Sequence, residues 1–328
     1  MNSEERRDYL DAAIIQLNSV FGVSGNIHPN NDELTMLVYM HILSYHFDDR
    51  EPIKKSPSEM RSIAQAAFVA RVSPQEKKRI LVTGGKQLLD YDVGKIKSLP
   101  EKDRVRLINL ERRSGKKGQK KYQLEFVKYH LRKIRDSLCH GHFIVKKDKN
   151  GNSILLIDNP IGNGGDEKHN FRCNYNFDCV CDICEMIADK EQLRHYRRVL
   201  TALKTGQQLD FANPENKLAY LDLLVNILYS YNEEEIQKDS SSIQRLLDAP
   251  GVGLTLDELR HIRHSVTHHY RKIQRNGNLD DILIVDYKDQ EKTKESFRKT
   301  IPFSTILRMG KNRGNEAEIR IGGDIIPY

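Results

Sequence analysis

Residues 131–140 read Leu-Arg-Lys-Ile-Arg-Asp-Ser-Leu-Cys-His, and residues 259–268 read Leu-Arg-His-Ile-Arg-His-Ser-Val-Thr-His. Six of the ten columns are identical, at a constant offset of 128 residues. An internal repeat of this kind constrains the fold, because both copies should form the same supersecondary unit. The repeat is therefore the starting point for every other expectation.

The similarity continues on both sides of the repeated stretch. Ile154–Asp158 matches Ile282–Asp286 column by column, and both copies carry Asn-Gly-Asn, a strong turn signal, before this strand-like segment. Upstream, Pro29 and Pro214 each lead into an apolar helical pattern. We interpret the chain as a duplicated domain in which the first copy carries an insertion.

The insertion follows from the spacing of equivalent residues. From Pro29 to Arg135 is 106 residues, but from Pro214 to Arg263 is only 49, a difference of 57 residues. We expect a first domain over 1–187, with a helical and basic insertion at about 51–121, and a second domain over 188–328.

Composition favours an anionic partner and an intracellular setting. The 328 residues carry a net charge of +7 and a pI near 9.0, which favours nucleic acid over a membrane. No apolar run approaches the ~18 residues of a membrane span, and the N-terminus has no signal-peptide core. Four of the five cysteines crowd into 173–184, unlike an extracellular disulfide framework. We expect a cytoplasmic protein with no membrane partner.

Periodicity and turn signals predict a helical chain with small hairpins after the two motif helices. Thr255 with Glu258 predicts a capping box at the start of the second motif helix. We expect a Gly/Asn-rich loop at 159–170 and a weakly patterned tail at 303–328. The expected helices are 4–20, 33–47, 57–72, 74–91, 120–140, 177–190, 189–204, 216–232, 241–248 and 255–272.

Each repeated stretch places an arginine five residues before a histidine: Arg135 with His140, and Arg263 with His268. These stretches resemble the Arg-x4-6-His signature of HEPN domains. The resemblance implies an all-α fold of two HEPN-like helical bundles in tandem, each with a small β-hairpin after the motif helix. It also implies a metal-independent endoribonuclease without a cofactor, whose two domains form one composite site.

The residue chemistry supports such a reaction independently of the family. Histidine exchanges protons near neutral pH, and arginine binds phosphate oxygens while remaining charged. Residues five positions apart point in directions about 140° apart around a regular helix. The arginine and histidine of one motif should therefore not both reach the same phosphate unless the last helical turn deforms. We therefore expect Arg135, His140, Arg263 and His268 to act together in one cleft.

Neighbouring residues could support these four. Asp136 could orient His140 four residues on and favour its protonated form, whereas His264 offers no such anion in the second copy. His140 would then act preferentially as the general acid and His268 as the general base. Ser137 and Ser265 could donate to phosphate or to the helix backbone, with the backbone favoured.

A basic run in the insertion is either a solvated loop or a phosphate-contacting arm. Under the second interpretation, RNA is also bound by one further arginine in each motif. The expected RNA-binding residues are Arg112, Arg113, Lys116, Lys117, Lys120, Lys121, Arg132 and Arg260.

The cysteines form the main alternative site. Cys173, Cys179, Cys181 and Cys184 have zinc-ligand types but not the spacing of a standard finger, and if 177–190 is a helix the last two could simply be core. The histidines of the second motif could also bind a metal at i, i+3 and i+4, but no carboxylate lies among them, so a metalloprotease is not favoured. These histidines are His261, His264, His268 and His269.

The sequence therefore predicts an endoribonuclease that cleaves single-stranded RNA by 2′-OH attack. Its expected setting is prokaryotic antiviral defence, through abortive infection, a toxin–antitoxin pair or a CRISPR-linked system. The alternative is a catalytically inactive RNA- or nucleotide-binding HEPN scaffold. A regulatory protein, a guide or trigger RNA, and a homodimer stay open as further partners.

Overall fold

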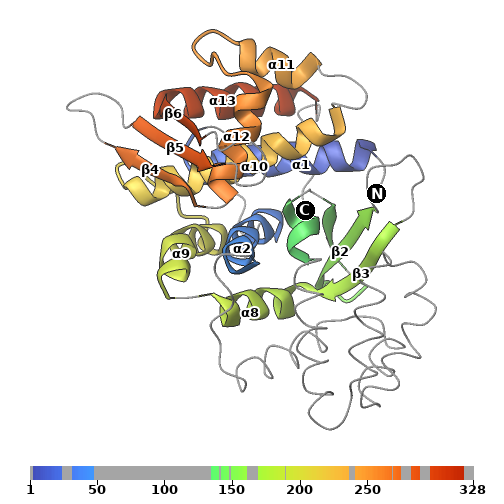
Figure 1. The fold of residues 1–328 in the computed structure, drawn as a ribbon. Helices are drawn as coiled ribbons and strands as arrows, with labels where there is room; N and C mark the ends of the chain where they lie inside the picture. Colours follow the sequence, from blue (N-terminus) through green and yellow to red (C-terminus); the bar gives the residue numbers. More distant parts are fainter. Residues whose placement is uncertain are drawn as a thin grey trace, which may run out of the picture. The chain divides into compact units, whose positions relative to one another are not determined.

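The computed structural model describes residues 3–23, 32–47, 134–139, 142–147, 149–160, 169–188, 190–235, 241–267, 269–274, 282–288 and 296–320. Within these ranges the protein is mostly helical, with two small antiparallel sheets of three strands each (Figure 1). None of the described helices combines the length and the apolar character needed to cross a membrane.

The chain forms two compact units. One contains Met1–Asp48 and Lys190–Tyr328, and the other contains Asp49–Asp189. The expected division at 187/188 lies close to the second of these boundaries. Residues 1–48, which we assigned to the first domain, instead group with the C-terminal part of the chain.

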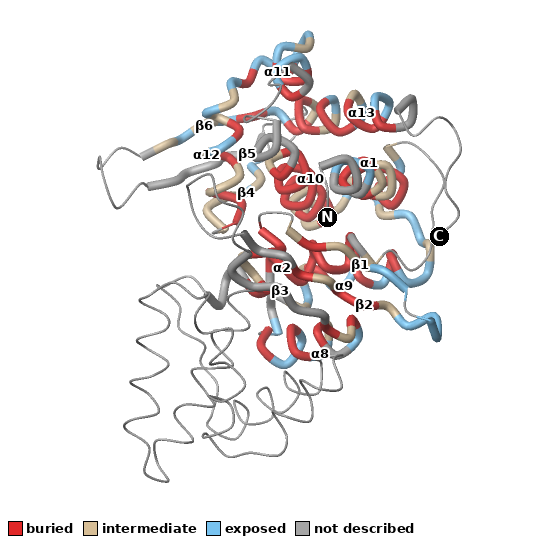
Figure 2. The backbone as a smooth tube through the Cα atoms, turned by 90° about the vertical axis from the view of Figure 1, so that its right-hand side faces the viewer, coloured by how far each residue is buried: buried red, intermediate tan, exposed pale blue. Residues whose placement is uncertain are grey.

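The first unit is a helical bundle with a sheet at one side. Its longest helix, α10, is almost wholly buried along its middle (Figure 2). Asn213 begins this helix by accepting a hydrogen bond from the Glu215 N–H at 2.9 Å. The elements of the unit are α1 (Ser3–Val20), α2 (Asp32–Phe47), α9 (Lys190–Thr205), α10 (Pro214–Glu235), α11 (Ser241–Asp248), α12 (Leu256–Thr267), β4 (Arg271–Gln274), β5 (Ile282–Lys288), β6 (Ser296–Pro302) and α13 (Phe303–Arg320).

Buried polar contacts join α1 to the C-terminal helix α13. Arg313 lies 3.4 Å from Asp11, and both side chains are fully buried. Asn18 donates from Nδ2 to the Gly310 carbonyl at 2.9 Å and accepts from the Tyr220 hydroxyl at 2.9 Å. Because buried polar groups must be satisfied, these bonds explain why residues 1–48 group with this unit.

The second unit contains a helical segment at 134–139 that is followed by a sheet and a helix. The sheet has the order β1-β2-β3 and is antiparallel throughout. Its elements are β1 (Phe143–Lys147), β2 (Ser153–Pro160), β3 (His169–Asn176) and α8 (Phe177–Ile187).

The two sheets repeat each other residue by residue. Leu155 pairs with Val145 and Tyr175, and Leu283, which is 128 positions later, pairs with Ile273 and Ile301. Phe177 and Phe303 then begin the helix that follows each sheet, and both are buried. The duplication therefore covers a motif helix, a three-stranded sheet and a further helix.

Most helix predictions in the described ranges agree with the structure to within three residues, and α11 agrees at both ends. The predicted capping box is confirmed, because the Thr255 N–H donates to Glu258 Oε2 and the Glu258 N–H donates to Thr255 Oγ1. The expected helices at 57–72 and 74–91 lie outside the described residues, as does most of 120–140.

Three predictions were wrong. Each hairpin gains a third strand, and in the first copy β2 and β3 extend into the two ends of the loop that we assigned to 159–170, at 159–160 and 169–170. The tail begins with the 18-residue helix α13. The second motif helix ends at Thr267 instead of about 272, because residues 271–274 pair in the sheet as β4.

We expect Gly310→Ala to destabilise the protein by about 1–3 kcal/mol, the usual range for overpacking a core. A Cβ on Gly310 would lie 1.9 Å from the Tyr220 hydroxyl oxygen. Urea unfolding of Gly310→Ala, Tyr220→Phe and the double variant measures the effect. The double variant should lose less than the sum of the single losses, because Tyr220→Phe removes the clashing atom; full additivity would contradict this contact.

Candidate functional site

The second motif helix, α12, ends in a defined cap. The Tyr270 N–H donates to the Ser265 carbonyl at 2.7 Å, and the His269 N–H donates to the Val266 carbonyl at 3.1 Å. This pair of bonds is the Schellman motif, which requires a left-handed residue at the position of His269. His269 has φ of 61°, and it is the only non-glycine residue in the described ranges with a positive φ.

This cap ends the helix between the motif arginine Arg263 and the motif histidine His268. The regular helix stops at Thr267, one residue before His268. His268 itself lies outside the described residues, as do His140 and Gly141.

The first motif helix ends with an equivalent bond. The His142 N–H donates to the Ser137 carbonyl at 2.8 Å, and both atoms stand 128 positions before their counterparts in the second copy. Gly141 occupies the sequence column of His269, and glycine is the residue type usual at this position of the cap.

The two motif arginines have different neighbours. Arg263 is half-buried, and its guanidinium carbon lies 4.6 Å from the centroid of the Tyr229 ring on α10, within cation–π range. Arg135 is also half-buried and donates from a terminal nitrogen to Asp136 Oδ1 at 2.9 Å. Asp136, which we expected to orient His140, thus accepts a hydrogen bond from the motif arginine.

The serines of the motif are fully buried. Ser265 donates to the His261 carbonyl one turn earlier at 2.9 Å. Of the two interpretations for Ser265, the helix-backbone bond is therefore the one that the structure contains. Ser137 is equally inaccessible.

The other predicted site residues are only partly described. Arg260 is exposed and His264 is half-buried. The predicted RNA-binding residues Arg112, Arg113, Lys116, Lys117, Lys120, Lys121 and Arg132 lie outside the described residues.

The cysteine and histidine clusters give no metal site in the described part of the chain, where no group of three or more potential ligands occurs. Cys184 is buried on α8, and burial raises the pKa of its thiol well above the usual range. Cys181 is half-buried on the same helix. The side chains of Cys173 and Cys179 are not described.

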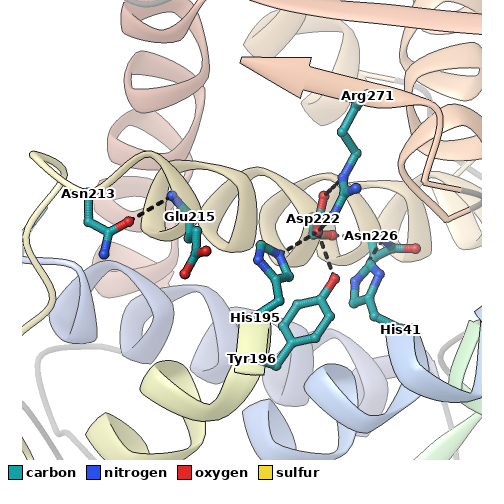
Figure 3. Close-up of polar contacts among 8 residues, drawn as sticks. All are labelled: His41, His195, Tyr196, Asn213, Glu215, Asp222, Asn226 and Arg271. Atoms are coloured by element: carbon teal, nitrogen blue, oxygen red, sulfur yellow. Dashed lines mark hydrogen bonds and ion pairs between the residues drawn. The ribbon is translucent and has the colours of Figure 1, made fainter. Parts of the chain in front are cut away.

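A buried polar cluster, which the sequence did not predict, lies at the end of α12. Its centre is Asp222 on α10, which is fully buried and binds Arg271 of β4 through both carboxylate oxygens (Figure 3). Tyr196 donates to Asp222 Oδ2 at 2.7 Å, and His195 Nε2 lies 3.9 Å from the same oxygen. We call this group, together with His41 and Asn226, the Asp222 cluster.

The Asp222 cluster reaches the motif helix through Asn226. The side-chain nitrogen of Asn226 donates to the Asp222 carbonyl at 2.7 Å and lies 3.4 Å from His41 Nε2 on α2. Its side-chain oxygen accepts from Thr267, the last residue of α12, at 3.5 Å. The end of the motif helix is thus fixed by residues from both α10 and α2.

Burial and charge set the protonation of the Asp222 cluster. Burial alone would raise the pKa of Asp222, but the Arg271 charge and hydrogen bonds, together with the nearby His195 imidazole, outweigh it and hold that pKa well below its usual range. Burial lowers the pKa of His41 to about 4, against the attraction of Asp222. Burial, with the Arg271 charge, lowers the pKa of His269 to about 3.

One signal in the sequence could have revealed the Asp222 cluster. Asp222 and Asn226 stand four residues apart on one helix face, and they are the only strongly polar residues in the apolar stretch 218–228. A carboxylate in such a stretch requires a buried partner, but the sequence does not show that the partner is Arg271.

We expect stability to fall as the pH decreases from 6.5 towards 4. The pKa of His41 is about 4 in the folded protein and about 6.5 when unfolded, so the unfolded state binds more protons in this window. The contribution is at most about 1.4 kcal/mol per pH unit for each such histidine. Urea unfolding at several pH values should show a shallower slope for His41→Gln than for the wild type. Equal slopes in wild type and His41→Gln would be the contrary result.

We expect His269→Gly to be more stable than His269→Ala by about 1–2 kcal/mol, because only glycine adopts a left-handed backbone without steric cost. Both variants lose the imidazole, so their difference reports the backbone at φ 61°. Thermal or urea unfolding measures it. A more stable alanine variant would contradict the Schellman assignment.

Comparisons of the chain with family models, with curated proteins and with solved structures gave no match.

Proposed function

We propose that this protein is a metal-independent endoribonuclease of the HEPN type, with two HEPN-like bundles in tandem. It would cleave single-stranded RNA by 2′-OH attack at a composite site of Arg135, His140, Arg263 and His268. The proposed setting is the cytoplasm of a prokaryote, in a defence response to phage or other foreign nucleic acid.

The observation that carries the proposal is the shared end of the two motif helices. In both copies the carbonyl of the serine two positions after the motif arginine (Ser137 or Ser265) accepts the capping hydrogen bond. The donor is the N–H of the residue five positions after that serine (His142 or Tyr270). The arginine of each pair therefore lies four residues before the last described helical residue, and the histidine of the second pair follows the last residue of α12. This position supports catalysis better than a packing role, because the arginine of each motif stays partly accessible while the motif serines are buried.

The contact between α2 and α10 supports the tandem arrangement. His41 and Asn226 each stand 12 residues after the prolines Pro29 and Pro214, so they occupy equivalent columns of the repeat. Their side chains approach to 3.4 Å. Equivalent residues touch each other at the axis of an isologous interface, as expected where two copies of one domain meet about a pseudo-twofold axis.

In the proposed reaction, one histidine accepts the proton of the 2′-OH, and the 2′ oxygen attacks the adjacent phosphorus. The bond to the 5′ oxygen breaks, and the second histidine donates a proton to that oxygen. The arginines stabilise the charge on the pentavalent phosphorane. The products are a 2′,3′-cyclic phosphate and a 5′-hydroxyl.

We expect His140→Ala and His268→Ala each to reduce cleavage of single-stranded RNA by about 100-fold or more, the usual contribution of a general acid or base. His261→Ala is the matched control, because His261 lies on α12, close in sequence to His268, but stacks on Phe297 with ring centroids 4.9 Å apart and lies 3.5 Å from Asp257. Product ends are identified by their 2′,3′-cyclic phosphate, with and without a chelator.

Full activity in the double variant, or products with a 3′-hydroxyl, would refute the mechanism. Salt-sensitive RNA binding by the wild type without any product would instead support the scaffold function.

A further inference from the structure

Helix α9 carries a large share of the net charge of the chain. Its 16 residues include five cations (Lys190, Arg194, Arg197, Arg198 and Lys204) and one acid, Glu191. The helix therefore contributes +5 − 1 = +4, compared with +7 for all 328 residues. None of these cations belongs to the basic run in the insertion or to the repeated motifs.

The cations of α9 lie on one side of the helix. Tyr196, Val199 and Leu203 are buried at helical spacing and pack this helix into the bundle, where it lies beside α2 and α10 (Figure 1). All five cations are exposed. We call the exposed cations of α9 the α9 basic face.

The arrangement of the α9 basic face does not serve helix stability. Arg194, Arg197 and Arg198 are three and four positions apart, where like charges repel by about 0.2–0.5 kcal/mol per pair. No ion pair or hydrogen bond joins these three side chains to any residue that the structure describes. Among the described residues these three arginines have no anionic partner, and an external anion would relieve the repulsion between them.

The α9 basic face is also rigidly supported. Tyr196, between Arg194 and Arg197, donates to the buried carboxylate of Asp222 at 2.7 Å. His195, the next residue towards the N-terminus, lies 3.9 Å from the same carboxylate. The arginines therefore project from a helix that is anchored in the Asp222 cluster, so little backbone entropy is lost when they bind a ligand.

We propose that the α9 basic face binds the sugar-phosphate backbone of single-stranded RNA and holds the strand that the composite site cleaves. This inference rests on the proposed function, because it assigns the substrate a second contact surface. Arginine suits the role because its planar fork binds two phosphate oxygens at once. From Arg194 to Lys204 the face extends about 15 Å along the helix axis, enough for several consecutive phosphates.

The test measures binding without cleavage. The probe is a fluorescent, fully 2′-O-methylated single-stranded oligonucleotide, which lacks the 2′ nucleophile, and its Kd is determined by anisotropy between 50 and 300 mM NaCl. The test variant is Arg194→Gln, Arg197→Gln and Arg198→Gln together. The control variant is Lys272→Gln, Arg298→Gln and Lys311→Gln together, which removes the same charge from exposed positions elsewhere in the same unit.

If all three arginines contact phosphates, the slope of log K against log salt should become shallower by about 2, at about 0.7 per contact on a single strand. At 0.1 M salt this corresponds to a roughly 100-fold weaker Kd. The control variant should change the slope by far less. Circular dichroism should show that both variants are folded, with the α9 variant no less stable, since it has lost like-charge repulsion.

A test variant that binds like the control, or a wild type that does not bind the probe, would overturn the inference. The two proposals fail separately. Cleavage of unmodified RNA by a wild type whose binding is insensitive to the α9 substitutions refutes only this inference. Loss of binding in the α9 variant of a protein that cleaves nothing refutes only the nuclease.

Discussion

The structure of the first unit depends on one ion pair in its core, between Asp222 and Arg271. Removing two charges from water costs several kcal/mol per ion, so such a pair is tolerated only with good geometry and further hydrogen bonds. Here the carboxylate accepts from the guanidinium through both oxygens, and Tyr196 adds a third bond. The pair joins α9, α10 and β4. Since β4 begins four residues after α12 ends, the pair also restricts where the motif helix can end.

Local signals were sufficient for much of the fold. The capping pair Thr255 and Glu258 and the two Asn-Gly turns act through neighbouring residues, and the repeat transfers each assignment from one copy to the other. The third strand β3 was missed although Phe171, Cys173 and Tyr175 alternate with polar residues in its sequence, whereas α13 lacks a strong apolar stripe. Arg313, for example, is charged but fully buried against Asp11, a partner 302 positions away that no periodicity can reveal.

The Asp222 cluster shows the same limit at the candidate site. Its side chains come from α2, α9, α10 and β4, and none of them belongs to the repeated columns of the motif. The repeat did predict which helices carry the arginines, but not that α12 would end before His268. That end depends on β4, where Arg271 must meet Asp222, and on His269, which adopts a conformation usually left to glycine. Contacts with distant residues therefore end the helix at Thr267, although the helical pattern in the sequence continues to about 272.

The two copies share a helix end but not the environment of the arginine, and this difference would give the two arginines unequal roles in the proposed site. The ring of Tyr229 restricts the plane of the Arg263 guanidinium without neutralising its charge. Asp136 places a negative charge 2.9 Å from Arg135, which reduces the positive field that this arginine presents to a phosphate. Asp136, already engaged by Arg135, is correspondingly less able to favour a protonated His140, so the arginine environments distinguish the copies better than the expected acid and base roles do.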